Sequence, residues 1–252
     1  MQFAVLGSGS RGNAMLVESN DTCVMVDCGF SVKETEKRLA ILQREPDEID
    51  AILVTHEHSD HIKGVGAFSR RYKTPVFTTR GTGRSQSLGE LPDWQRIIPE
   101  QDIAFNDLHI MSYPVPHDAR EPCQFIFSNG DRRFGLLTDT GSSTTHIEQL
   151  MSGCHAMMLE CNHDLDMLAE SSYPASLKQR ISGQFGHLSN EQAADFLRAI
   201  DTEKLEQLVV AHISEQNNTP TLVKQSVCEA LECESDWIEL ADQDQPLNWR
   251  TV

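Results

Sequence analysis

The chain has 252 residues, of which 39% are hydrophobic and 23% charged, and it carries a net charge of −17. This apolar content excludes a disordered chain, and the length suits one large domain with its own core. No apolar run approaches the roughly 18 residues of a membrane-spanning helix. The N-terminus lacks the basic flank of a signal peptide, so we expect a cytoplasmic protein without membrane association.

The first half of the chain alternates short strands and helices. Apolar runs predict strands near 2–6, 14–18 and 22–27, and a buried strand at 51–54. Ser31 and Glu34 form an S-x-x-E capping box before apolar residues at helical spacing, so a helix begins at Ser31. A second helix is expected over 62–72, followed by strands near 76–78 and 97–98.

The second half mixes the same elements. Ser189 and Gln192 form another capping box, which predicts a helix over 189–200. Further helices are expected at 144–152 and 220–231, and strands near 108–113, 123–128, 133–138, 156–160 and 207–211. No Pro/Gly/Ser linker divides the chain. We therefore expect a single α+β domain over 1–252, with two sheets inside helical layers.

A glycine-rich segment from Gly7 to Gly12 matches the G-x-G-x-x-G pattern, and Asp27 lies about twenty residues further on. A dinucleotide-binding fold, however, needs a crossover helix of about ten residues or more before its second strand. Here Asn20 and Asp21 mark a turn, and the next strand begins almost at once. The sequence thus predicts a loop between hairpin strands and no nucleotide cofactor.

The cysteines favour a reducing compartment. There are seven, an odd number, and none forms a C-x-x-C pair. A disulfide framework would show an even count in a short secreted chain. Cys23, Cys154 and Cys228 have apolar neighbours, as expected of small buried side chains.

The strongest motif is T-H-E-H-S-D-H at 55–61, directly after the buried strand. His56 and His58, two apart on extended chain, point to the same side and can bind one cation. Asp60 and His61 follow after the chain turns and can reach a second cation. Imidazole and carboxylate ligands suit zinc, manganese or iron. The motif therefore predicts two divalent metal ions, with zinc preferred and manganese or iron as alternatives.

Three more ligand-type residues, His117, Asp139 and His212, stand where buried strands end. A strand end can hold such a side chain rigidly. Each residue alone is as readily structural as metal-binding, but together they complete two sites. The predicted ligands are His56, His58 and His117 for one ion, Asp60, His61 and His212 for the other, and Asp139 as the bridge.

This ordered set resembles the metallo-β-lactamase superfamily, whose fold is a four-layer αββα sandwich with a dinuclear metal site along one edge. The segments G-S-G-S-R-G-N at 7–13, E-C-N-H-D at 160–164, Y-P at 173–174 and G-H-L-S-N at 186–190 resemble the YycJ (WalJ) family. Members of that family are described as metal-dependent exonucleases acting on DNA. The resemblance implies the same metal ligands, degradation from 5′ to 3′, and Asp27 as a supporting residue that hydrogen-bonds to the ligand loop.

A dinuclear centre makes a bridging hydroxide available near neutral pH. Two divalent ions carry more charge than Asp60, Asp139 and a hydroxide cancel, and the remaining charge of about +1 favours an anionic phosphodiester. Asp60 is thus both a ligand and a catalytic residue. We expect a metal-dependent hydrolase acting on DNA. The alternatives are a hydrolase of a small ester, thioester, lactone, lactam or cyclic phosphodiester, and a binding protein with a vestigial site.

The charge distribution bears on the substrate. Residues 62–98 hold seven basic residues against Glu90 and Asp93, whereas residues 201–252 hold eleven acidic and three basic ones. A charged run is most often a solvated face. Alternatively, a basic segment on an acidic protein is where an anionic substrate would dock.

Several polar residues outside the ligand set are candidates for substrate contact. His187 precedes the expected helix start at Ser189, where free N–H groups attract phosphate, and it could protonate a leaving alkoxide. We predict His187 as general acid or phosphate contact, and His163 as substrate contact or support for the ligands. A structural role is the alternative for both histidines. The remaining candidates for substrate binding are Ser189, Ser8, Ser10 and Asn13.

Overall fold

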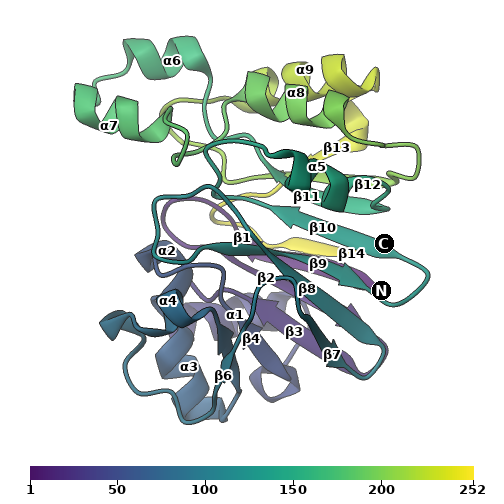
Figure 1. Cartoon of the computed structure of the whole chain (residues 1–252). Coiled ribbons are helices and arrows are strands. Elements are labelled where there is room, and N and C mark those ends of the chain that lie inside the picture. The colour runs from purple at the N-terminus through teal and green to yellow at the C-terminus, as the bar shows by residue number, and fades with distance from the viewer. The chain divides into compact units, whose positions relative to one another are not determined.

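Residues 1–252 are all described by the computed structural model, which divides them into two compact units (Figure 1). The first unit comprises Met1–Pro114, Ala119–Arg132 and Ala241–Val252. The second comprises Val115–Asp118 and Arg133–Leu240. Each unit has its own strands, helices and buried side chains, and each is described by itself below.

The first unit is built on a sheet with the strand order β14-β1-β2-β3-β4-β5-β6. Its strands are β1 (Gln2–Gly7), β2 (Ala14–Ser19), β3 (Thr22–Val26), β4 (Ala51–Leu53), β5 (Val76–Thr78), β6 (Trp94–Arg96) and β14 (Leu247–Thr251). Strands β14 to β3 pair antiparallel, and β3 to β6 pair parallel. The hairpin predicted between the first strands is confirmed. The strand predicted at 97–98 is wrong, since the paired residues are 94–96.

Helices connect the parallel strands of this sheet, as parallel pairing requires. They are α1 (Val32–Ile41), α2 (Ser59–Ile62), α3 (Val65–Tyr72) and α4 (Arg80–Gly83), with single 3₁₀ turns at Pro46–Glu48 and Gln86–Leu88. The hydroxyl of Ser31 caps α1 by accepting the N–H of Glu34, which confirms its predicted start. α1 and α3 cover one face of the sheet, where Leu39 and Phe68 join its buried core (Figure 1).

The helix predicted over 62–72 is two helices, α2 and α3, that meet at Gly64. A Cβ at Gly64 would lie 2.1 Å from the carbonyl oxygen of Phe30. The N–H of Gly64 donates to the carbonyl of Cys28 instead of to its own helix. The break therefore follows from the close approach of the segment after β3.

The first unit also contains an antiparallel ladder of β7 (Asp102–Phe105), β8 (Leu108–Pro114) and β9 (Cys123–Ser128). Tyr113, Phe125 and Phe127 of this ladder are fully buried. β8 and β9 match the predicted strands, while β7 has a half-exposed pattern that gave no clear signal in the sequence.

The second unit has four parallel strands, β10 (Arg133–Leu137), β11 (Ala156–Glu160), β12 (Gln207–Ala211) and β13 (Ile238–Leu240), paired in that order. Its helices are α5 (Thr145–Met151), α6 (Leu165–Glu170), α7 (Ala175–Ile181), α8 (Asn190–Ala199) and α9 (Pro220–Leu231), with a 3₁₀ turn at Ser235–Trp237. α8 and α9 pack together (Figure 1). The capping box of Ser189 and Gln192 is present at the start of α8, as predicted.

All seven cysteines are free thiols. Cys23 and Cys154 are buried as predicted, whereas Cys228 is half-buried near the end of α9, so its predicted burial is wrong in part. None of the helices has both the length and the apolar character required to span a bilayer.

Candidate metal centre

Each unit has candidate ligands at the carboxyl ends of parallel strands, where α/β sheets commonly bind ligands, whereas His117 follows the antiparallel strand β8. In the first unit, Asp27 follows β3 and the segment 55–61 follows the neighbouring β4. In the second unit, Asp139 follows β10, Glu160 ends β11, and His212 follows β12. Within each unit, parallel pairing therefore brings residues that are distant in sequence close together.

Three of these residues leave their strands in the left-handed region of the backbone. The φ angles are 58° for Asp27, 52° for Asp139 and 51° for His212. This conformation costs about 1–3 kcal/mol in a residue with a side chain and is concentrated at functional sites. The left-handed backbone turns each side chain out of the strand direction. The strain at these three positions lowers the stability of the fold.

In the first unit, Asp27 fixes the ligand loop. Its carboxylate accepts hydrogen bonds from the N–H and the hydroxyl of Thr55, at 2.9 and 2.8 Å. Nδ1 of His61 lies 2.7 Å from Oδ2 of Asp27. Burial raises the pKa of Asp27, and His61 and Thr55 oppose that rise. With Nδ1 engaged by Asp27, Nε2 is the nitrogen of His61 that is left to bind a metal.

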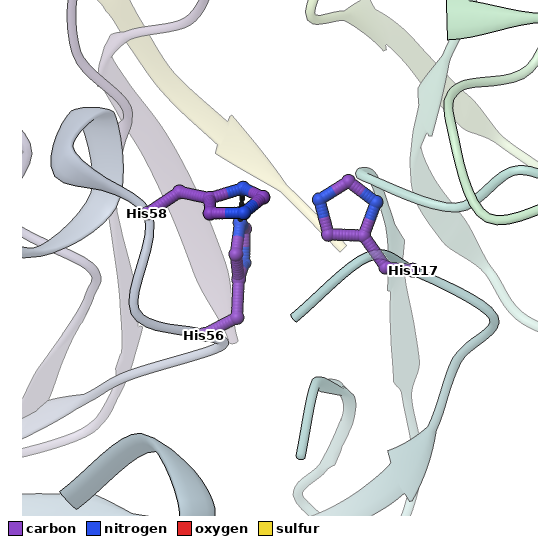
Figure 2. Close-up of side chains that lie close together, drawn as sticks. All are labelled: His56, His58 and His117. Atoms are coloured by element: carbon purple, nitrogen blue, oxygen red, sulfur yellow. Dashed lines mark hydrogen bonds between the residues drawn. The ribbon is translucent and has the colours of Figure 1, made fainter. Parts of the chain in front are cut away.

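His56 and His58 bring two ring nitrogens close together. Nε2 of His56 lies 3.0 Å from Nδ1 of His58, the contact drawn dashed in Figure 2. The rings are nearly perpendicular, at 81°. Two nitrogens bound to one tetrahedral zinc ion, each 2.0–2.1 Å from it, would lie about 3.3 Å apart. The pair therefore fits a single divalent ion.

Asp60 and His61 form a second pair in the same loop. Oδ2 of Asp60 lies 3.4 Å from Nε2 of His61, and the amide of Asn13 lies 3.2 Å from each of these atoms. A Cβ at Gly29 would lie 1.7 Å from the carbonyl oxygen of Asp60, so only glycine fits beneath the loop. Asn13, which directly follows the glycine-rich segment, and Gly29 thus contact the predicted ligands.

The candidate substrate contacts in this segment differ in exposure. Asn13 accepts hydrogen bonds from Ser8 and from the N–H of Gly9 while it contacts Asp60 and His61. Ser8 is buried and Ser10 is exposed. The structure therefore gives Asn13 and Ser8 a role in holding the ligand loop, and it leaves Ser10 accessible to solvent.

In the second unit, the buried carboxylate of Glu160 lies between two histidines. Its Oε1 lies 2.7 Å from Nδ1 of His187 and 2.8 Å from Nδ1 of His212. Its Oε2 accepts the N–H groups of Thr140 and Leu188. Burial alone would raise the pKa of Glu160, but the two histidines lower it to about 2. Glu160 is therefore ionised. On each of the two histidine rings it contacts Nδ1 and not Nε2.

Asp139 and His117 complete the candidate ligands of the second unit. Oδ1 of Asp139 lies 3.5 Å from Nδ1 of His212. The ligand atoms of Asp139, Glu160, His187 and His212 all lie within 4.8 Å of one another. The ring of His117, labelled in Figure 2, is buried, and its Nδ1 lies 3.0 Å from the carbonyl oxygen of Gly186. That carbonyl can only accept, so Nε2 is the nitrogen left to bind a metal.

Sequence reasoning missed Glu160 as a functional residue. The signal was present, because Glu160 ends an apolar strand in the same way as the predicted ligands follow theirs. Metal-binding histidines commonly donate their second nitrogen to a carboxylate or a carbonyl. Asp27, Glu160 and the carbonyl of Gly186 supply such acceptors. The donor set and its hydrogen-bonded support thus fit divalent metal ions.

The other predicted residues lie beside the start of α8. The side chain of His187 is 22% exposed, and its Nδ1 is the nitrogen that contacts Glu160. The hydroxyl of Ser189 caps α8 and is thereby engaged with the N–H of Gln192. His163 is fully buried, and neither ring nitrogen has a hydrogen-bond partner. Burial lowers the pKa of His163, so its ring is neutral.

Comparison with known proteins identifies the class. The model of the β-lactamase superfamily domain matches residues 22–213. The crystal structure of the metallo-β-lactamase fold protein YhfI from Bacillus subtilis covers 97% of this chain and 98% of its own, with a TM-score of 0.74 and 14% identity. The chain therefore belongs to the metallo-β-lactamase superfamily and has its α+β sandwich fold, as predicted.

Two relatives are similar over nearly the whole chain. The exodeoxyribonuclease YycJ of Bacillus anthracis is 37% identical over 236 residues, which cover 92% of this chain and 89% of that protein. The exodeoxyribonuclease WalJ of Streptococcus pneumoniae is 35% identical, covering 91% and 88%. The resemblance to the YycJ (WalJ) family is thereby confirmed, and the chain is a metal-dependent hydrolase of this superfamily.

Proposed function

We propose that this chain is a cytoplasmic DNA exonuclease that uses two divalent metal ions, with zinc preferred. In this proposal the two units act together as one domain over 1–252. The observation that carries the proposal is the ordered support of the histidines by Asp27 and Glu160, on a chain similar to two exodeoxyribonucleases. The seven free thiols support the cytoplasmic assignment.

The proposed ligands are those predicted from the sequence. One ion would be held by His56, His58 and His117, the other by Asp60, His61 and His212, and Asp139 would bridge them. Divalent ions bound there would lower the pKa of water and stabilise the charge on a phosphodiester in the transition state. Glu160 and Asp27 hold the ligand rings in the orientation that leaves the binding nitrogen available.

The remaining steps fall to residues of the chain. Glu160 is ionised and its Oε1 accepts from Nδ1 of His187, so the carboxylate fixes the orientation of that ring and leaves Nε2 as the nitrogen that can meet the substrate. A protonated His187 can give the proton on Nε2 to the leaving oxygen of the cleaved strand. We propose His187 as this general acid. The direction of attack, 5′ to 3′, is proposed from the family resemblance.

The test is digestion of end-labelled single-stranded and duplex DNA by the metal-stripped protein, resupplied with zinc, manganese or magnesium in turn. We expect release of mononucleotides from the 5′ end, abolished by a chelator and restored by zinc or manganese. His58→Ala should bind less metal and lose this activity, whereas the control His109→Ala, at an exposed strand position, should retain both.

Other products would change the assignment. Release from the 3′ end would overturn the proposed direction alone. An enzyme that leaves all DNA intact but hydrolyses bis(p-nitrophenyl) phosphate, a cyclic phosphodiester or a thioester would overturn the exonuclease and retain the metal-dependent hydrolase.

A further inference from the structure

We propose that a surface of the first unit around Trp94 binds single-stranded DNA and guides it to the metal centre. This inference rests on the proposed function and names where its substrate lies. The surface, called here the Trp94 patch, consists of Arg80, Arg84, Trp94, Arg96 and Arg120. All five residues are exposed.

Trp94 is held rigidly although 43% of it is exposed. It begins the edge strand β6, and its indole N–H donates to the hydroxyl of Thr78 at 2.8 Å. A Cβ at Gly83 would lie 2.9 Å from the indole nitrogen, so the end of α4 lies against one side of the ring. A fixed indole with an exposed surface is the kind of platform on which a nucleic-acid base stacks.

Three arginines of the patch have no carboxylate partner. Arg80 and Arg84 stand at the two ends of α4, and their guanidinium groups, like that of Arg96, make no ion pair. Arg96 follows Trp94 by two residues on β6 and so points to the same side of the strand. Unpaired guanidinium groups beside an exposed aromatic ring match the alternating phosphates and bases of a nucleic-acid strand.

Not all of the basic segment 62–98 is available in this way. Arg71 forms an ion pair with Glu36 at 2.9 Å, and Arg70 donates to the carbonyls of Leu88 and Glu90. Three of the remaining basic residues, Arg80, Arg84 and Arg96, lie together at α4 and β6, while Lys63 and Lys73 are exposed elsewhere in the segment. These residues lie on an otherwise acidic chain with a net charge of −17.

The patch is connected to the ligand loop through Glu57, which stands between His56 and His58. Oε1 of Glu57 accepts the backbone N–H of Arg120 at 2.9 Å. The hydroxyl of Thr82, within α4, lies 3.5 Å from Oε2 of Glu57. The guanidinium of Arg120 in turn reaches the carbonyl of Arg84 at 3.4 Å. A DNA strand bound along the patch would therefore lie next to the ligand loop.

Acidic residues near the patch are already engaged. Glu121 accepts the N–H of Gly81, and Asp93 accepts from the side chain of Gln95. Their charge is thus partly offset by donors of the same unit.

The occupant we infer is a single strand and not a duplex, because the bases of a duplex are stacked on each other and offer no free face to an indole.

The first test compares Trp94→Ala with Trp94→Phe in the metal-loaded protein, using a fluorescent oligothymidine with phosphorothioate linkages that resist cleavage. We expect Trp94→Ala to weaken binding between about 5-fold and 160-fold, the range for loss of one stacked base. Trp94→Phe keeps a stacking ring and should stay within about 2-fold of wild type. Turnover of bis(p-nitrophenyl) phosphate, which contains no nucleic-acid strand that could lie along the patch, should be unchanged in both variants.

The second test uses the salt dependence of binding. Removing two phosphate contacts from a single strand lowers the slope of log K against log salt by about 1.4. We expect this change for the double variant Arg84→Ala/Arg96→Ala. The matched control is Lys33→Ala/Lys37→Ala, which removes the same charge from exposed positions on α1 and should leave the slope unchanged.

The outcomes separate this proposal from the one on which it rests. If wild type degrades DNA but Trp94→Ala binds the oligothymidine as tightly as wild type, the Trp94 patch is wrong and the exonuclease stands. If wild type binds no DNA, both proposals fall. Tighter binding of a blunt duplex, or of the matching RNA strand, than of single-stranded DNA would overturn the occupant we assign.

Discussion

The carboxylate of Glu160 accepts a hydrogen bond of 2.8 Å from Nδ1 of His212, although the two residues are 52 positions apart in sequence. Strands β11 and β12 pair parallel, with Glu160 in register with Ala211, the residue before His212. The positive φ of His212 then turns its ring toward the carboxylate. A strand register and one strained residue together set the orientation of a proposed metal ligand.

Replacement of this carboxylate should weaken metal binding. Glu160→Gln keeps the size of the side chain but removes the charge that orients His187 and His212. Loss of such a supporting group typically reduces metal affinity by about 10- to 100-fold. Competition with a chromophoric chelator would measure the change, and circular dichroism would verify the fold. Glu203→Gln, at an exposed position, is the control and should bind metal as wild type does. Equal affinity of the Glu160 variant and wild type would contradict the role.

The class of fold and the positions of the candidate ligands at strand ends could be predicted from sequence because their signals are local. The motif from His56 to His61 spans six positions, and His117, Asp139 and His212 each follow a recognisable apolar strand. Capping boxes marked the starts of α1 and α8 correctly. In each case the residues that determine the local structure lie within one short segment of the chain.

Other features depend on tertiary contacts and gave no local signal. The break at Gly64 follows from the approach of Phe30, which lies more than thirty positions away. In the sequence, Glu160 is only a charged residue at the end of an apolar strand. Its contacts follow from the pairing of β11 with β10 and β12. The Trp94 patch could not be predicted from the sequence, because no periodic pattern of residues indicates that Gly83 packs against the indole.

Gly29 should be intolerant of a side chain. A Cβ there would lie 1.7 Å from the carbonyl oxygen of Asp60 and 2.6 Å from the backbone nitrogen of Asn13. Gly29→Ala must therefore displace the ligand loop, and we expect loss of metal content together with a lower melting temperature. Elemental analysis and thermal unfolding would measure both. Gly130→Ala is the control, since its Cβ meets nothing within 4 Å and its positive φ of 94° imposes backbone strain alone. Full metal content in Gly29→Ala would show that the loop can shift without loss of its ligands.

Stability should fall at alkaline pH through the thiol of Cys23. Burial, followed by the charge of Glu18, raises the pKa of Cys23 from 9.0 to about 12. The unfolded chain therefore loses this proton at lower pH than the folded chain. The contribution of the protonated thiol to the free energy of unfolding is fully present below pH 9 and is lost as pH rises to about 12. We expect Cys23→Ala to show a shallower decline of the free energy of unfolding across this range, measured in urea. Parallel declines for the two proteins would remove Cys23 as a cause.

The proposed general acid can be separated from a ligand by the choice of leaving group. His187→Ala should lower the turnover of DNA by about 100- to 10,000-fold, because an alkoxide leaves poorly without a proton. Turnover of bis(p-nitrophenyl) phosphate should change far less, since p-nitrophenolate leaves without protonation. Elemental analysis should find the same metal content as in wild type, and His109→Ala, an exposed histidine, should match wild type on both substrates. Equal losses on the two substrates together with a missing metal ion would instead make His187 a ligand, a result that its position within 4.8 Å of Asp139 and His212 also allows.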